Sequence, residues 1–444
     1  MRSAERGSRP SRRVAFVLLA GMIVAACDTA TITSEPPDTE ATPMGPPSAS
    51  ASPSAQPSPE GAAADLASVL NVLERVHPDP FHGLERDDFV ALLDDFHATL
   101  PSLTPEEAMV EFMRVWAALS RQGRDGHQFA LPQARHAGPM LPIRVYEFSE
   151  GLYVTAALAP HEDLVGARIT AVAGMPIEDV LSQLEPLVPR DGPATVPSFR
   201  PLFFLRADVL RGLGILAAET IALDVDIGDE PRTVDLAPVS ADVFNDWVGG
   251  GLPHQLPIDP EVGYLASTEP FSAELRDDGV AYLRYRSVQN ADVREVRRWM
   301  DAGEFDRLIL DLRQNPGGDN GTYGTLLRLI QDFAESHPGS LTVIIDRVTF
   351  SAASNLTTEI ERTTDARFIG EPMGGGLNFW NDVTWVDLPN LPIPMNASVS
   401  TRYWQFAADP EDPRLTIEPD RPIEVTAADH FARRDPALEA ALKP

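Results

Sequence analysis

The chain has 444 residues, of which 43% are hydrophobic and 23% are charged. That is enough apolar material for two or three packed domains rather than one. The 36 basic and 66 acidic residues give a formal net charge of −30. Such a surface repels phosphate backbones, so the composition argues against nucleic-acid binding and favours a soluble, well-solvated exterior. The only lysine is Lys443, next to the C-terminus.

The first 27 residues have the pattern of an export signal. Five arginines precede the apolar run 14–26, which is too short for a bilayer core that needs roughly 20 residues. The run ends in Val-Ala-Ala-Cys27, and Cys27 is the only cysteine. This ending resembles a bacterial lipobox and predicts a lipoprotein, extracytoplasmic and anchored to a bacterial membrane through lipidated Cys27. The alternative, an ordinary secretory signal, leaves a lone thiol in an oxidising compartment.

The chain then passes from a tether into a helical region. Residues 28–61 are rich in Pro, Ser and Ala, and their composition predicts a disordered tether. Residues 62–138 form the predicted N-terminal helical region, because apolar residues recur at helical spacing over 62–76, 86–100 and 104–119. Thr104 and Glu107 have the spacing of a capping box. A loop that contains His127 follows the third helix.

The remainder of the chain alternates between strand and helix patterns. Residues 139–240 contain strand-like segments and, over 165–177, a strand, a tight turn and the start of a helix. In 241–444, strands at 280–283, 308–312 and 341–346 alternate with helices at 292–302, 321–334 and from Ser351. This alternation predicts an α/β fold with a largely parallel sheet.

Three segments of the C-terminal half carry candidate chemistry. A buried strand runs into Pro-Gly-Gly at 311–318, which suits either an oxyanion hole or a plain tight turn. A second strand delivers Ser351 to the start of a helix, where a serine can act as a nucleophile or as a helix N-cap. The glycine-rich segment 370–378 can be a substrate-facing loop or only a loop, and it lacks the Lys and Ser/Thr of a phosphate-binding loop.

Together, the order and spacing of these segments resemble the C-terminal-processing, or tail-specific, serine peptidases. The likeness extends to the Asp-Gly-His127 segment, to a PDZ-like segment at 165–177 and to the Pro-Asp ending at 419–420. The resemblance implies a crotonase-like αβ peptidase core over 241–444, preceded by the helical region and by a divergent PDZ-like module over 139–240. It also implies a peptide or protein substrate and no cofactor.

The resemblance implies Ser351 as nucleophile, with a choice between two bases. One branch of the family pairs the serine with a later lysine, and no lysine lies between Ser351 and Lys443. The other branch, similar to the tricorn core protease, uses a histidine that precedes the PDZ-like module, which His127 matches. The N–H groups of Gly317 or Gly318 and of Ala352 are the predicted oxyanion donors. A carboxylate is expected to orient the histidine, and its candidates by position are Asp409, Glu411 and Asp412.

Alternative interpretations remain open at this point. His77 and His82 suggest a metal site, but two prolines deny them helical geometry and the sequence offers no third ligand, so no metal is predicted. Retinoid-binding relatives of the family favour a non-catalytic ligand- or peptide-binding lipoprotein as the main rival. An esterase is disfavoured because the Gly-x-Ser-x-Gly elbow is absent around Ser351.

Overall fold

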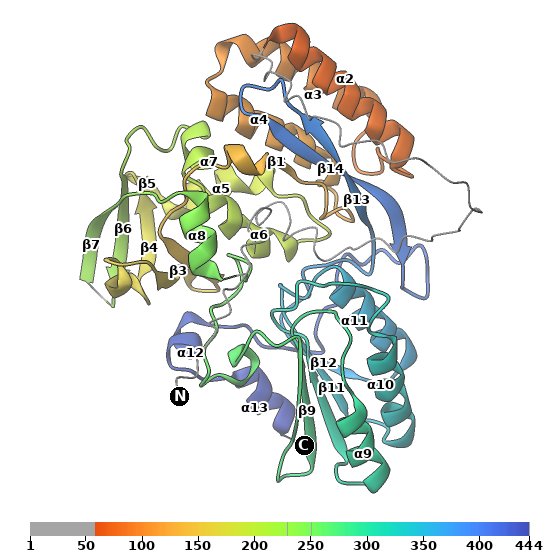
Figure 1. Cartoon of the computed structure of the whole chain (residues 1–444). Helices are drawn as coiled ribbons and strands as arrows, with labels where there is room; N and C mark the ends of the chain where they lie inside the picture. Colours follow the sequence, from red (N-terminus) through yellow and green to blue (C-terminus); the bar gives the residue numbers. More distant parts are fainter. Residues whose placement is uncertain (1–57, 229, 250, 444) are drawn as a thin grey trace, which may run out of the picture.

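A computed structural model describes residues 58–228, 230–249 and 251–443 (Figure 1). The predicted signal peptide, the lipobox at Cys27 and nearly all of the tether lie outside these residues. Within the described ranges, no helix combines the length and the apolar character that crossing a bilayer requires.

The three predicted N-terminal helices are confirmed. They are α2 (Pro59–Val76), α3 (Arg86–Thr99) and α4 (Pro105–Ala117), and short 3-10 turns follow α3 and α4. The predicted capping box opens α4, because the Thr104 hydroxyl accepts from Glu107 N while the Glu107 carboxylate accepts from Thr104 N. Each helix buries one apolar stripe, and these stripes share a core with the rest of the N-terminal half.

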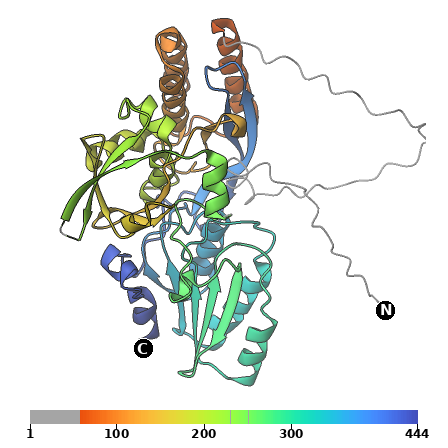
Figure 2. The ribbon, with the colours of Figure 1, turned by 60° about the vertical axis from the view of Figure 1, so that its left-hand side comes forward.

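A hairpin from the C-terminal half completes this helical region. Strands β13 (Asn378–Leu388) and β14 (Met395–Gln405) pair along their length, and β14 also pairs with β1 (Ala130–Pro132). Figures 1 and 2 show the hairpin, in blue, lying beside the orange helices near the start of the described chain. Trp116 Nε1 donates to Ser398 O at 3.1 Å, and Asp65 accepts two bonds from Asn390. The N-terminal helices and the hairpin at 378–405 therefore pack as one unit.

An antiparallel sheet forms the middle of the chain. Its order is β2 (Ile143–Phe148), β3 (Gly151–Ala157), β4 (Arg168–Val172), β6 (Ile221–Ile227) and β7 (Glu230–Leu236), with β5 (Met175–Pro176) on β4. The predicted strand, turn and helix at 165–177 correspond to β4, a turn with positive φ at Ala173 and Gly174, and α5 (Ile177–Leu184). Helices α6 (Thr195–Phe204), α7 (Ala207–Gly212) and α8 (Ala241–Val248) complete this part.

The C-terminal sheet is largely parallel, as predicted. Its order is β15 (Arg421–Pro422), β12 (Arg367–Gly370), β11 (Leu341–Ile345), β10 (Arg307–Asp311), β9 (Val280–Tyr285) and β8 (Phe271–Leu275), and only β8 is antiparallel. Helices α9 (Arg294–Ala302), α10 (Gly324–Ser336) and α11 (Ala352–Thr363) cover one face, while α13 (Pro436–Leu442) covers the other. Alternate strand residues serve the two faces: Leu308 packs with the first group and Ile309 with the second. The short α12 (Ala427–Phe431) precedes α13.

A buried arginine ties α13 to the sheet. The Arg313 guanidinium is 2% exposed, donates to Asp311 and Asp435, and lies 3.8 Å from the centre of the Tyr264 ring. Asp435 also caps α13 by accepting from Leu438 N. A charge this deeply buried is tolerated only while its partners remain in place.

We expect Asp435→Ala to destabilise the protein by about 3 kcal/mol, because part of the Arg313 charge then lies buried without a partner. Urea unfolding of the variant measures this loss. The matched control is Asp292→Ala, which removes one partner of the exposed Arg294 pair and should leave the unfolding midpoint unchanged. Equal midpoints for the two variants would contradict the interpretation of Arg313 as a structural anchor.

Candidate active site

Ser351 lies at the turn between β11 and α11 with an unusual backbone. Its φ and ψ are 56° and −125°, a region that side-chain-bearing residues rarely adopt. The side chain forms no capping bond to α11, so the N-cap interpretation does not describe it. Instead, the hydroxyl accepts from Asn381 Nδ2 of β13 at 3.3 Å. The strain must be offset by the surrounding contacts, and such sites are concentrated where function requires them.

One buried carboxylate holds the two turns that follow β10 and β11. Asp346 accepts from the backbone N–H and the side-chain amide of Gln314, at 3.1 and 2.7 Å, and from the N–H groups of Val348 and Thr349. Burial, followed by the nearby charge of Glu371, raises the pKa of Asp346 to about 6. Residues 312–318 (the glycine turn) and 346–351 (the serine turn) are therefore fixed side by side at the carboxyl edge of the sheet.

The glycine turn approaches Ser351 closely. A Cβ on Gly317, whose φ is 107°, would lie 2.7 Å from Ser351 Cβ, and a Cβ on Gly318 would lie 2.0 Å from Val288 O. Only glycine fits either position. Gly317 N already donates to Asn315 Oδ1 at 2.9 Å. The N–H groups of Gly318 and Ala352 donate to no group in the described part of the chain, so these two are the better oxyanion donors.

His127 is buried beside the serine turn. Its ring stacks on the rings of Phe350 and Phe379, with 4.6 and 5.7 Å between ring centres. Its backbone carbonyl accepts a hydrogen bond from Ser398 Oγ. Burial lowers the pKa of His127 to about 3, so the imidazole is neutral at physiological pH and free to accept a proton, but it is a weaker base than one whose pKa lies near the operating pH. No hydrogen bond joins the ring to Ser351, although catalytic bonds are often long until substrate binds.

His127 and Ser351 line one cavity, with an empty volume of about 920 Å³ that includes the solvent at its mouth. Most of the wall is apolar. His254 is a polar side chain in this wall. It is 3% exposed, and neither of its ring nitrogens has a hydrogen-bond partner in the described residues. Burial lowers its pKa to about 3 as well. The apolar and aromatic lining consists of Phe129, Leu131, Met140, Phe199, Leu202, Phe203, Leu252, Pro253, Pro316 and Phe350.

The predicted orienting carboxylates do not contact His127. Asp409 and Glu411 are exposed, and the Asp412 carboxylate pairs with Arg414. His127 Nδ1 is buried and has no hydrogen-bond partner among the residues described. The structure thus brings together the predicted nucleophile, base and oxyanion donors, but it does not bring the acidic cluster to the base.

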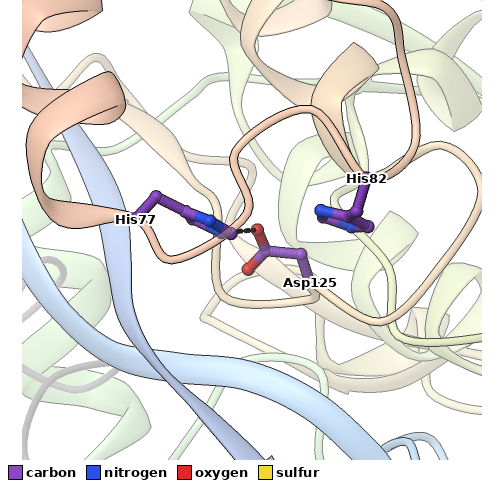
Figure 3. Close-up of side chains that lie close together, drawn as sticks. All are labelled: His77, His82 and Asp125. Atoms are coloured by element: carbon purple, nitrogen blue, oxygen red, sulfur yellow. Dashed lines mark hydrogen bonds and ion pairs between the residues drawn. The ribbon is translucent and has the colours of Figure 1, made fainter.

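The interpretation of His77 and His82 gains a third candidate ligand, Asp125, and the three ligand atoms lie within 4.8 Å of one another (Figure 3). The hydrogen bonds argue against a metal, however. Asp79 N donates to His77 Nδ1 at 3.1 Å, so the ring proton is on Nε2, which faces the Asp125 carboxylate at 3.0 Å. A metal on Nε2 would leave both ring nitrogens without a proton. Ser400 Oγ donates a hydrogen bond to the other carboxylate oxygen of Asp125. The arrangement therefore favours a buried His–Asp pair.

Sequence reasoning missed Asn381 and Asp346, and it interpreted the glycine-rich segment 370–378 as a substrate-facing loop or only a loop, without the packing of residues 374–376 against the serine turn. That segment is buried, and a Cβ on Gly375 would lie 2.0 Å from Ser354 Oγ and 3.3 Å from Ser351 N. It therefore supports the nucleophile rather than forming an open loop. Asp346 directly follows a buried strand, which is a usable signal, whereas nothing in the sequence near Asn381 distinguishes it.

No protein-family model matches the chain. Among solved structures, mature CPAF complexed with lactacystin is 14% identical, with a TM-score of 0.58 over 86% of this chain and 97% of that chain. A CPAF mutant is 15% identical, with a TM-score of 0.60 over 84% and 95% of the two chains. The photosystem II D1 C-terminal processing protease is 13% identical, with a TM-score of 0.41 over 82% and 93%. The chain has the mixed α/β fold of the CPAF structures.

We expect Gly317→Ala to slow reaction of Ser351 with a fluorophosphonate probe by about 100-fold or more, because the new methyl group displaces Ser351 and the oxyanion donors. Gly339→Ala is the matched control: its φ is 79° and no atom lies within 4 Å of the added methyl group. This control should react like the wild type. Equal reactivity of the two variants would show that close approach at Gly317 is unimportant.

Proposed function

We propose that the protein is a serine peptidase in which Ser351 is the nucleophile and His127 the general base. The observation that carries the proposal is the shared cavity: a strained serine and a neutral, buried histidine line the same wall. The fold of CPAF supports it at the level of architecture. A peptide or protein is the substrate class that this resemblance favours.

The proposed mechanism proceeds through an acyl-enzyme. His127 takes the hydroxyl proton as Ser351 Oγ attacks the scissile carbonyl, and the N–H groups of Gly318 and Ala352 hold the oxyanion. The protonated His127 then gives its proton to the leaving amine. In the second half, His127 takes a proton from water as the water oxygen attacks the acyl carbon. His127 then gives that proton to Ser351 Oγ as the acyl–oxygen bond breaks, which releases the acid product and restores the free serine.

The cavity wall defines the side chain that this peptidase would accept. Its lining is dominated by aromatic and aliphatic groups such as Phe199, Phe203 and Phe129. The charge of Arg206, which also lines it, is paired with Asp208. We therefore propose cleavage next to an apolar residue. The PDZ-like interpretation of 139–240 would add a second peptide-binding surface, and it remains a prediction.

A second function, binding without catalysis, is favoured by one observation. No hydrogen bond joins His127 to Ser351, and the cavity offers an apolar ligand a mostly apolar wall. Such a protein would retain the fold and take up an apolar peptide or small molecule without cleaving it.

We expect a fluorophosphonate probe to label the wild-type full chain at Ser351 and Ser351→Ala not at all. His127→Ala should react about 10²- to 10⁴-fold more slowly, because a general base typically contributes that much. His136→Ala is the matched control. It changes an exposed histidine on the other side of β1 from His127 and should leave labelling unchanged. Absence of labelling in folded wild type, together with saturable binding of an apolar peptide, would establish the binding function instead.

The site of action is proposed from the N-terminal sequence. Lipidation of Cys27 would anchor the folded part to a bacterial membrane outside the cytoplasm, about 30 residues of tether away. This arrangement would place the peptidase among extracytoplasmic peptides and proteins.

We expect Cys27→Ser to abolish incorporation of a clickable palmitate analogue and to move the protein from the membrane fraction to the soluble fraction. Ser34→Ala in the tether is the matched control and should remain membrane-bound. Membrane retention of unlipidated Cys27→Ser would contradict the anchor.

A further inference from the structure

The segment 190–195 lies between the two halves of the active site. Its backbone pairs with the histidine loop (residues 124–128), since Arg124 N donates to Asp191 O at 2.8 Å and Asp125 N donates to Arg190 O at 3.2 Å. On the other side, Thr195 Oγ1 donates to Gly374 O at 2.5 Å. This short segment therefore contacts both the loop that carries the base and the glycine segment (residues 374–376) that supports the nucleophile.

The Asp191 carboxylate makes the same connection with its two oxygens. Oδ1 accepts from Gly126 N at 2.6 Å, and Gly126 immediately precedes His127. Oδ2 accepts from Gly376 N at 3.2 Å, next to the glycine that packs on Ser351 N. Asp191 is fully buried and lines no part of the cavity. Its role is therefore to hold backbone rather than to touch substrate.

We propose that Asp191 is a positioning residue whose carboxylate sets the distance between His127 and Ser351 by bonding the loops that carry and support them. The inference rests on the proposed peptidase function and adds a requirement to it. A buried carboxylate with two N–H donors is rigidly placed, and a shift of about 1 Å in the relation of base to nucleophile can cost about 100-fold in rate.

The charge state of Asp191 makes the role testable. Burial raises its pKa to about 7, the two N–H groups and Arg124 oppose that rise, and Asp125 adds to it. The glycine segment contributes N–H groups and no charge. A protonated carboxyl presents an O–H where an N–H donor already points, so one of the two bonds is lost. Positioning should therefore fail as the pH falls through about 7.

His127 cannot be the source of that loss if burial keeps its pKa near 3. The part of the acid limb near pH 7 then reports Asp191 rather than the base, and a part near pH 6 reports Asp346. Most serine peptidases with a histidine base lose activity when the histidine itself is protonated, so the two origins make different predictions.

The test is the rate of fluorophosphonate labelling of the full chain between pH 4.5 and 9. We expect wild-type labelling to fall as the pH drops through about 7 and to level off about 10- to 100-fold below its rate at pH 8, once Asp191 is protonated. Asp191→Asn keeps one acceptor and cannot ionise. It should label about 10- to 100-fold more slowly at pH 8 and lack the fall centred near pH 7, so that any remaining fall lies lower, near the pKa of about 6 of Asp346. Asp65→Asn, at a buried aspartate that also accepts two bonds, is the matched control and should keep the wild-type profile.

A second measurement needs no variant at Asp191. In ¹⁵N-histidine spectra of wild type, assigned with His127→Ala, the His127 ring should remain neutral at pH 5. An imidazole that titrates near pH 7, or an unchanged acid limb in Asp191→Asn, would overturn the positioning role while leaving the peptidase intact. Absence of labelling in wild type at every pH would remove the peptidase function and this inference together.

Discussion

The Asp346 carboxylate is the constraint on which the site depends. A carboxylate in a dry interior is unfavourable unless its lone pairs are filled, and here N–H groups from both the glycine turn and the serine turn fill them. Two further bonds join these turns directly, from Phe350 N to Asn315 O at 3.1 Å and from Thr349 Oγ1 to Leu312 O at 3.0 Å. The backbone strain at Ser351 can persist because the turns on either side cannot relax independently.

The other half of the site comes from the opposite end of the chain and is completed by the β13–β14 hairpin. Strand β14 pairs with β1, which directly follows the histidine loop, and Ser398 on β14 bonds the His127 carbonyl. Strand β13 supplies Phe379, which stacks on His127, and Asn381, which bonds Ser351. The hairpin therefore touches base and nucleophile at once. Neither the N-terminal helices nor the C-terminal sheet can form the site alone.

Periodicity predicted the helices and most strands because each is a local pattern of burial. The glycines and small residues around Ser351 carried the resemblance to the peptidase family, and that resemblance, with no lysine available between Ser351 and Lys443, implied His127 as the base. The residues that connect the histidine loop to the serine turn have no such local pattern in the sequence. Asp191 accepts hydrogen bonds from residues 65 and 185 positions away in the chain. In the sequence, a buried acidic residue in a loop cannot be distinguished from an acidic residue that is exposed to solvent. The acidic cluster at 409–412 was the opposite case, since it had the expected position but lies at the surface.

Burial shifts the pKa values of two ionisable groups at the histidine loop, His127 and Asp191, in opposite directions. It lowers the pKa of His127 and raises the pKa of Asp191, because in both cases the neutral form is easier to keep out of water. In the proposed mechanism, a site that favours neutral groups at rest must still accept an oxyanion and an imidazolium during acylation. Since His127 Nδ1 has no hydrogen-bond partner among the residues described, the imidazolium gains little from the protein at rest. The negative charge of the oxyanion, which faces two backbone N–H groups, must therefore balance most of the positive charge of the imidazolium. Proton transfer is then tightly coupled to attack on the carbonyl.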